Sequence, residues 1–300
     1  MKALVTGATG FVGPYLVRHL RACGDEVVGA GDAESGFDVV DRDGVLDAFT
    51  AHRPDIVYHL AARSHVGASW HDPVATLRVN VEGTANVLDA AVAVGVRRVI
   101  VVGSAEEYGR VDEQKPLTEE TPARPLTPYG ASKAAASLLA LQAQLAGGVE
   151  TVRVRPFSHT GPGQSAAFVV PALAARVADA ERAGADQIRL GARTPVRDLS
   201  DVRDVVRAYR LLADAGEPGA VYNVCRGVWV SIGDLAEWFV SHATRPLSVE
   251  SDPELTRATD VPYLVGDPAR LVAATGWQPE FTLDDTLGAV LEHARASQSS

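Results

Sequence analysis

The sequence predicts an α/β protein in which helices cover both faces of a doubly wound parallel sheet, followed by a smaller α+β domain. Three observations lead to this prediction. Short β-branched runs alternate with helical patterns over the first 160 residues. These runs are apolar without alternation, as expected of strands that are buried on both faces. After about residue 157, Gly and Pro cluster in HTGPGQ and the strand-like runs become irregularly spaced.

The elements of the first sheet can be placed one by one. The expected strands cover residues 2–6, 26–30, 55–61, 98–104 and 151–156. The expected helices include 14–24 and 73–95, the second with apolar residues at 74, 77, 81, 85, 88 and 92. Later strand-like runs are QIRLG, AVYNV and LSVES.

Composition and charge exclude several classes of protein. The formal net charge of −10 argues against a nucleic-acid partner, because neutralising phosphates takes clustered cations. No apolar run reaches the ~18 residues that a membrane span requires, so no membrane association is expected. The opening MKALVTGATG lacks the apolar core of a signal peptide, which favours a cytoplasmic location. His59, His65 and His71 are six residues apart, which matches no zinc spacing, so no metal is expected.

The strongest motif is TGATGFVG, which comes directly after the first strand and before the first helix. Gly7, Gly10 and Gly13 allow a tight turn and a close approach of the backbone to a pyrophosphate, which the N–H groups of the helix N-terminus can bind. A glycine-rich turn without a ligand is the alternative. We therefore predict a Rossmann sheet that binds a dinucleotide, with Thr9, Phe11 and Val12 at the same turn.

The adenosine end of the dinucleotide depends on the residues after the second strand. Asp32 follows Gly13 by nineteen residues, where a carboxylate accepts hydrogen bonds from the ribose and repels a 2′-phosphate. NAD is therefore expected, with NADP as the second possibility and a plain turn aspartate as the alternative. Asp38 and Val39 are expected to flank the adenine. The small or apolar Leu60, Ala61 and Ala62 end the next strand, where a cofactor can cross its edge.

The catalytic candidates are Tyr129 and Lys133, four residues apart on one face of a helix that begins at Pro128. Seven tyrosines and three lysines in 300 residues give 7 × 3/300, about 0.07, such pairs by chance. Lysine, unlike arginine, offers a compact ammonium. We expect Lys133 and an oxidised nicotinamide to lower the pKa of Tyr129 from near 10 by roughly 2 to 3 units. Ser104 ends the fourth strand and can hold the same substrate oxygen, although a turn cap is its alternative role.

The chain resembles the extended short-chain dehydrogenases/reductases that act on nucleotide-diphosphate sugars. The resemblance is carried by TGATGFVG, YHLAARSHV, GSAEEYG, PYGASK, RPFSHTGPGQ, VRDLSDVRDVVRAY and VPYLVGDPARLVAATGWQPE, and it spans almost the whole chain. Within that family the chain is most similar to the GDP-4-dehydro-6-deoxy-D-mannose reductases. We therefore expect residues 1–160, with a return at about 200–228, to bind the cofactor. About 161–199 and 229–300 are expected to bind the sugar nucleotide.

The resemblance also implies roles for single residues. Ser104, Tyr129 and Lys133 match the family's catalytic triad. Arg197 and Arg257 match residues that bind the diphosphate of the substrate, for which guanidinium groups are well suited. Ser158 stands where the family usually has Asn. The remaining expected contacts are Pro156 for the cofactor, and Val66 and His159 for the substrate, with packing as an alternative role for His159.

The stretch GSAEEYGR decides between two reactions. A 4,6-dehydratase needs an acid beside the departing hydroxyl, and its family pattern is typically Thr, then Asp or Ser, then Glu. Here the string is Ser104, Ala105, Glu106 and Glu107, so Glu106 alone fits. We therefore predict a reductase of a 4-keto-6-deoxy sugar nucleotide. A 4,6-dehydratase, a 4-epimerase and a non-catalytic nucleotide sensor stay open as alternatives.

Two helices are more apolar than one buried face requires: the helix over 73–94, and the helix that carries Lys133. The sheet covers one face of each. The resemblance implies that the other faces pair in a four-helix bundle, which predicts a homodimer.

Overall fold

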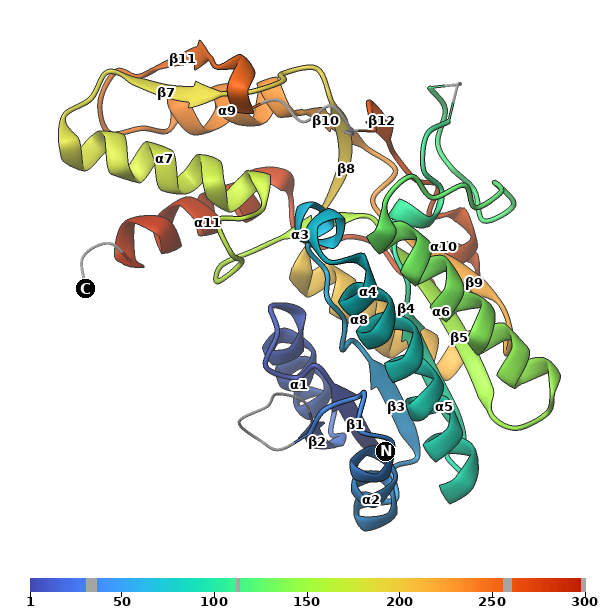
Figure 1. Ribbon diagram of the computed structural model, residues 1–300. Helices are drawn as coiled ribbons and strands as arrows, with labels where there is room; N and C mark the ends of the chain where they lie inside the picture. The colour runs from blue at the N-terminus through green and yellow to red at the C-terminus, as the bar shows by residue number, and fades with distance from the viewer. Residues whose placement is uncertain (31–36, 112–113, 256–260, 298–300) are drawn as a thin grey trace.

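A parallel six-stranded sheet forms the centre of the molecule in the computed structural model, which describes residues 1–30, 37–111, 114–255 and 261–297 (Figure 1). Its strand order is β2-β1-β3-β4-β5-β9. The strands are β1 (Lys2–Thr6), β2 (Glu26–Ala30), β3 (Ile56–His59), β4 (Arg98–Val102), β5 (Glu150–Pro156) and β9 (Val221–Val224). The predicted α/β class and the five predicted strands are confirmed. AVYNV supplies the sixth strand, in the late return expected at 200–228.

Alternating side chains of these strands enter two separate cores, as the two-residue period of a strand requires. Ala3 and Val5 pack with α1 (Val12–Ala22), α8 (Val202–Ala215) and α10 (Ala269–Thr275) on one face. Leu4, between them, packs with α2 (Arg42–His52), α5 (Gly83–Val94) and α6 (Pro128–Leu145) on the other. The sheet is therefore covered on both faces, which explains why its strands are continuously apolar.

The long helix predicted over 73–95 is interrupted by a turn of π-helix. α4 (Pro73–Leu77) leads into the π-helical segment η1 (Arg78–Glu82), and α5 continues from there. The apolar positions 74, 77 and 92 are exposed, whereas Asn80, Thr84 and Val87 are buried. The predicted apolar stripe therefore mostly faces away from the sheet, and the buried face of this helix carries polar side chains near the site.

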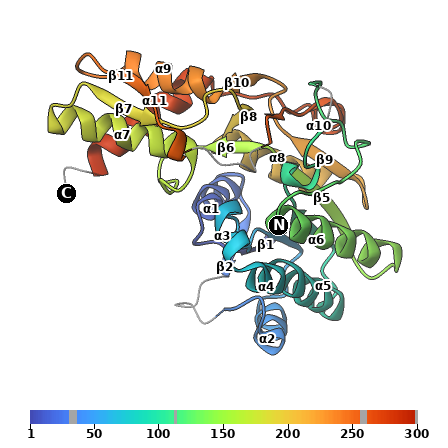
Figure 2. The same cartoon turned by 45° about the horizontal axis from the view of Figure 1, so that its top comes forward.

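The C-terminal part of the chain builds a second layer beyond the carboxyl ends of the first sheet (Figures 1 and 2). Its apolar core joins α7 (Val169–Ala183), α9 (Ile232–Ser241) and α11 (Leu283–Ser297) to the two-stranded sheet of β7 (Gln187–Leu190) and β11 (Ser248–Ser251). A small mixed sheet lies between the layers, with β8 (Val196–Asp201) paired to β6 (Ser158–Thr160), β10 (Trp229–Ser231) and β12 (Tyr263–Leu264). The exact boundaries of two domains stay a prediction.

The remaining elements are short: α3 (Val66–His71) and the 3₁₀ turns η2 (Ala105–Glu107) and η3 (Pro253–Leu255). Among the residues that the structure describes, none of the helices is both long enough and apolar enough to cross a membrane.

Candidate active site

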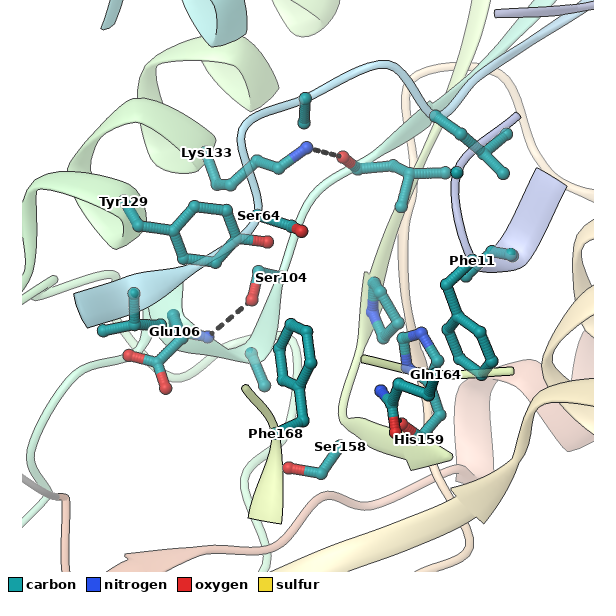
Figure 3. A pocket seen from close by; sticks show the side chains of 18 of the residues that line it. Phe11, Ser64, Ser104, Glu106, Tyr129, Lys133, Ser158, His159, Gln164 and Phe168 are labelled. Carbon is teal, nitrogen blue, oxygen red and sulfur yellow. Dashed lines mark hydrogen bonds between the residues drawn. The ribbon is translucent and has the colours of Figure 1, made fainter. Parts of the chain in front are cut away.

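A cavity of about 540 Å³ opens at the carboxyl ends of β1, β3, β4 and β5, the edge where open α/β sheets bind ligands (Figure 3). Most of the predicted site residues line it. They are Gly7, Thr9, Gly10, Phe11, Val12, Gly13, Leu60, Ala61, Ala62, Val66, Ser104, Glu106, Tyr129, Lys133, Pro156, Ser158 and His159. The fold therefore brings together residues that are up to about 150 positions apart in the sequence.

The glycine-rich turn at one end of this cavity leaves no room for side chains. Gly7 has φ +69°, and a Cβ on it would lie 2.8 Å from the Ala61 nitrogen. A Cβ on Gly13 would lie 2.2 Å from the Ala8 oxygen. At its N-terminus, helix α1 has no side-chain hydrogen bond at its cap residue Phe11. This N-terminus, lining the cavity, fits a pyrophosphate.

The predicted adenosine contacts have mixed outcomes. Asp32 lies outside the described residues, so its contact with the ribose stays a prediction. Asp38 and Val39 are described, but neither lines the cavity. The Asp38 carboxylate accepts a hydrogen bond from Val40 N–H, and Val39 is buried in the core against Gly83. Their placement beside the adenine therefore stays a prediction.

Tyr129 and Lys133 both lie in the first two turns of α6. Thr127 caps this helix by accepting from Gly130 N–H, and Pro128 occupies the first turn, where its missing N–H costs nothing. Both side chains are buried, and the four-residue spacing places them on the face toward the cavity. Lys133 Nζ donates to the Val102 oxygen at 2.7 Å, at the end of β4.

Ser104 combines the two roles that the sequence left open. Its Oγ accepts from Glu106 N–H at 3.1 Å and caps η2. The same side chain lines the cavity, and its hydrogen bonding opposes the rise in the pKa of Tyr129. The cap fixes the serine at the end of the strand, and its hydroxyl remains within reach of a ligand.

Burial dominates the electrostatics of this group. It raises the pKa of Tyr129 above its ordinary value, and the carboxylates of Glu106 and Glu107 raise it further, against the hydrogen bond from Ser104. In the protein by itself, burial of the phenolate outweighs the hydrogen bond from Ser104, and the lowering expected from Lys133 together with an oxidised nicotinamide stays a prediction. Burial also lowers the pKa of Lys133 to about 8, with Glu107 opposing the shift. Near neutral pH the site holds a phenol ready to donate a proton beside a lysine that is still charged.

The two adjacent glutamates have different surroundings. Glu106 lines the cavity and is partly exposed. Glu107 is fully buried, where its Oε1 accepts from Ser104 N–H at 2.9 Å and its Oε2 accepts from Arg155 Nε at 2.8 Å. Arg155 in turn stacks on the Tyr108 ring at 4.7 Å. Glu107 is therefore a structural ion-pair partner that fixes the backbone of Ser104.

The segment after β5 forms another wall of the cavity. The His159 ring stacks on Phe11 with a centroid separation of 6.3 Å, and its Nδ1 bonds the Phe157 oxygen at 2.9 Å. Burial lowers its pKa, so this imidazole is neutral. Its neighbour Gln164 is held by Thr160 and by the His159 oxygen. His159 thus lines the site and packs at the same time.

A second cavity of about 320 Å³ adjoins the first and shares Val66, Glu106, Phe168 and Val169 with it. Arg197 lines this cavity from β8, and its Nη1 donates to the oxygens of Val196 at 2.9 Å and Val261 at 2.8 Å. Arg257 lies outside the described residues. Of the two predicted diphosphate ligands, only Arg197 can therefore be placed.

Sequence reasoning missed three residues. Asn80, in the π-helical turn, bonds Arg63 N at 2.8 Å and Ser132 Oγ at 2.8 Å, and so ties the loop after β3 to α6. Phe168 lines both cavities, and Tyr209 lines the first from α8. A polar residue inside an apolar helix was a signal for Asn80. Phe168 and Tyr209 look like ordinary core residues in the sequence.

Comparisons with known proteins agree with this geometry. The pattern of the NAD dependent epimerase/dehydratase family matches residues 3–225. The chain is 36% identical over 293 residues to the GDP-6-deoxy-D-mannose reductase of Pseudomonas aeruginosa, covering 97% of this chain and 96% of that one.

Two solved structures have the same architecture. RMD from Pseudomonas aeruginosa, complexed with NADPH, superposes with a TM-score of 0.91 at 34% identity, covering 99% of this chain and 100% of that one. The UDP-glucose 4-epimerase of Thermus thermophilus, in complex with NAD, superposes with a TM-score of 0.89 at 31% identity and the same coverage. The glycine-rich turn, the Ser104–Tyr129–Lys133 group and these matches together show that the chain belongs to the NAD dependent epimerase/dehydratase family.

Proposed function

We propose that the protein reduces the 4-keto group of a GDP-4-dehydro-6-deoxyhexose, of the GDP-4-dehydro-6-deoxy-D-mannose type, to a hydroxyl group. The observation that carries this proposal is the cavity itself. It joins a dinucleotide-binding turn to a buried, protonated phenol in one space. Two of the relatives support this chemistry, since one is a GDP-6-deoxy-D-mannose reductase and the structure of RMD holds NADPH.

Each residue around the carbonyl carbon then has a separate role in the reduction. When bound, the reduced nicotinamide dinucleotide supplies the hydride. Tyr129 donates its proton to the carbonyl oxygen, which Ser104 holds by a hydrogen bond. Lys133 positions the cofactor ribose and supplies positive charge beside the phenol. Burial keeps Tyr129 protonated, so its proton is available to the substrate oxygen.

The sugar nucleotide would extend from Tyr129 into the second cavity. Val66, Ser158 and His159 line the first cavity and Arg197 lines the second, which supports this path. We propose that Arg197 and Arg257 bind the diphosphate. The carboxylate of Asp32 favours NADH over NADPH, and the ratio of kcat/KM for the two cofactors tests that preference.

A 4,6-dehydratase is the second candidate, because Glu106 places a carboxylate in the cavity. Its neighbour Ala105 offers no polar group, and Glu107 is occupied by Arg155. A dehydratase or an epimerase returns the hydride to the sugar, so neither consumes reduced cofactor. A non-catalytic nucleotide sensor would bind ligands and turn none over.

One set of reactions separates these candidates. The protein is mixed with GDP-mannose alone, and then with GDP-4-dehydro-6-deoxymannose and each reduced cofactor, while absorbance and products are followed. The reductase predicts stoichiometric loss of reduced cofactor with the keto sugar. Water loss from GDP-mannose without net cofactor consumption contradicts it and supports the dehydratase, and binding without any product supports the sensor.

We also propose that the protein is a homodimer. Large apolar side chains remain exposed on neighbouring helices α4, α5 and α6, among them Val74 at 74%, Leu138 at 64% and Leu145 at 78%. A second copy covering these helices would form a four-helix bundle. Sedimentation at micromolar concentration should give twice the chain mass, and a monomer would contradict the dimer. The cytoplasmic location stays a proposal.

A further inference from the structure

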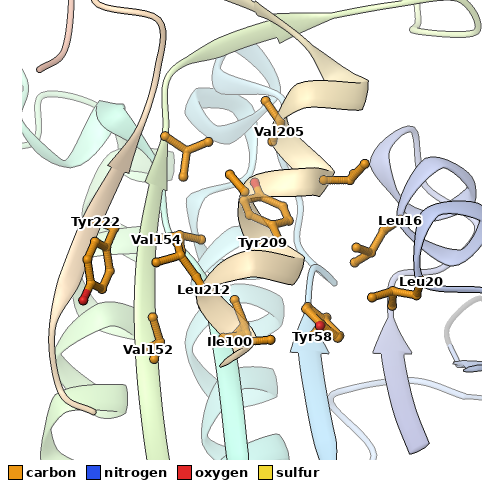
Figure 4. Close-up of a cluster of buried hydrophobic side chains, with 14 of the residues drawn as sticks. Leu16, Leu20, Tyr58, Ile100, Val152, Val154, Val205, Tyr209, Leu212 and Tyr222 are labelled. Atoms are coloured by element: carbon orange, nitrogen blue, oxygen red, sulfur yellow. The ribbon is translucent and has the colours of Figure 1, made fainter. Parts of the chain in front are cut away.

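Tyr209 reaches the first cavity from the opposite face of the sheet to Tyr129. It belongs to α8, whereas Tyr129 and Lys133 belong to α6, and these helices pack on different faces. The Tyr209 ring lies in the apolar cluster with Leu16 and Ile100, and its hydroxyl points toward the carboxyl ends of the strands (Figure 4). The side chain is 1% exposed and lines the cavity.

The hydroxyl of Tyr209 has no hydrogen-bond partner within the described part of the chain. Three other tyrosines are paired: Tyr15 with the Pro162 oxygen, Tyr108 with Asn223 and Tyr222 with Glu217 N–H. Unlike the Tyr58 hydroxyl, which is sealed from solvent without a partner, the Tyr209 hydroxyl is open to the cavity, where it can donate a hydrogen bond to a ligand group. Burial raises the pKa of Tyr209, which keeps the hydroxyl protonated and able to donate.

The surroundings of this hydroxyl narrow the choice of ligand group. Val102 packs against the same apolar cluster as Tyr209, and Pro156, Phe157, Leu199 and Leu264 add further apolar surface to the cavity. A dinucleotide that starts at the glycine-rich turn and ends beside Tyr129 brings its nicotinamide to this wall. The ring itself suits apolar walls, but its carboxamide needs a polar partner.

We infer that the Tyr209 hydroxyl hydrogen-bonds the carboxamide of the cofactor's nicotinamide. The ring is then held between two tyrosines, with Tyr129 on the α6 side for chemistry and Tyr209 on the α8 side for binding. This inference rests on the proposed function only in placing the nicotinamide beside Tyr129.

The test compares Tyr209→Phe with Tyr58→Phe. Tyr58 lies in the same cluster with an unpartnered buried hydroxyl, but it does not line the cavity, so it is a matched control. The dissociation constants of reduced cofactor and of the matching ADP-ribose, which lacks the nicotinamide, are measured by calorimetry without sugar. We expect Tyr209→Phe to weaken cofactor binding about 3- to 10-fold and leave ADP-ribose binding unchanged. Tyr58→Phe should change neither.

Three results would overturn the inference. Unchanged cofactor affinity in Tyr209→Phe removes the contact, and equal weakening for ADP-ribose moves it away from the nicotinamide. A clear loss of stability without ligand would show that the hydroxyl serves the fold. Failure of the proposed function looks different, because cofactor binding would persist while the keto sugar is not reduced.

Discussion

The cofactor side and the sugar side of the active site are built in different ways. The cofactor side consists of the ends of parallel strands, a glycine-rich turn and the first turns of α1 and α6, all continuous with the main core. The sugar side is assembled from separate segments: α3, the loop before α7 and its first turns, β8, and residues near 158 and 261. The chemistry therefore rests on one continuous sheet, whereas substrate choice rests on segments that only the tertiary fold brings together.

The largest expected effect comes from Tyr129→Phe, at the boundary of the two sides. Removing one hydroxyl takes away the proton donor, so kcat should fall by about 10³-fold or more. The ring remains, and calorimetry should show a cofactor dissociation constant close to that of the unchanged protein. Turnover near the original rate would remove Tyr129 from the mechanism.

Glu107→Gln tests the buried ion pair between Glu107 and Arg155, which lies on the cofactor side of the site. The buried Arg155 would lose its charged partner, which should lower the free energy of unfolding by about 3 kcal/mol. Glu106→Gln, one residue earlier and partly exposed, is the matched control and should cost less than about 1 kcal/mol. Denaturant unfolding measures both variants. Equal losses of unfolding free energy in the two variants would contradict a special structural role for the buried Glu107.

The lysine on the cofactor side predicts a pH dependence of stability. The folded protein releases the Lys133 proton near pH 8, whereas the unfolded chain holds it to about 10.5, so the unfolded state binds more protons between these values. Stability contributed by this group must therefore rise with pH across that window, by roughly 2 to 3 kcal/mol. Lys133→Met lacks this rise. Denaturant unfolding gives the free energy of unfolding of both proteins from pH 7 to 10. This free energy should rise with pH in the unchanged protein relative to Lys133→Met, and a constant difference between the two proteins would contradict the lowered pKa.

The smallest effect is expected on the sugar side. Ser158→Ala removes one hydroxyl from the cavity lining, which should raise KM for the sugar nucleotide about 3- to 5-fold. The cofactor dissociation constant should not move, because Ser158 is proposed to contact the sugar nucleotide and not the cofactor. Steady-state kinetics with each substrate varied in turn measures both quantities. A change in cofactor affinity with an unchanged KM for the sugar nucleotide would mean that Ser158 contacts the cofactor and not the sugar.

The same division explains what the sequence could predict. The first sheet was predicted strand by strand because buried parallel strands leave continuous apolar runs, and Gly7 and Gly13 mark a turn that only glycine can form. Tyr129 and Lys133 were found because residues four apart in a helix lie on the same face, so their spacing in the sequence predicts their proximity.

Other features depend on contacts that sequence does not record. Nothing next to Glu107 in the sequence indicates Arg155, which lies 48 residues away across the sheet. Burial raises the pKa of Tyr129 in the protein by itself, which the sequence does not reveal, and the lowering by Lys133 and an oxidised nicotinamide stays a prediction. Tyr209 resembled a core residue until its hydroxyl was seen to line the cavity.

The most direct test of the central claim follows hydrogen from the cofactor to the sugar. The protein is given GDP-4-dehydro-6-deoxymannose with reduced cofactor deuterated at either hydrogen of nicotinamide carbon 4, and the product is examined by mass spectrometry. Net reduction beside Tyr129 predicts one deuterium at sugar carbon 4 from one of the two labelled cofactors. If neither of the two labelled cofactors transfers deuterium to the product, the proposed hydride transfer is contradicted, since the hydride would then come from elsewhere.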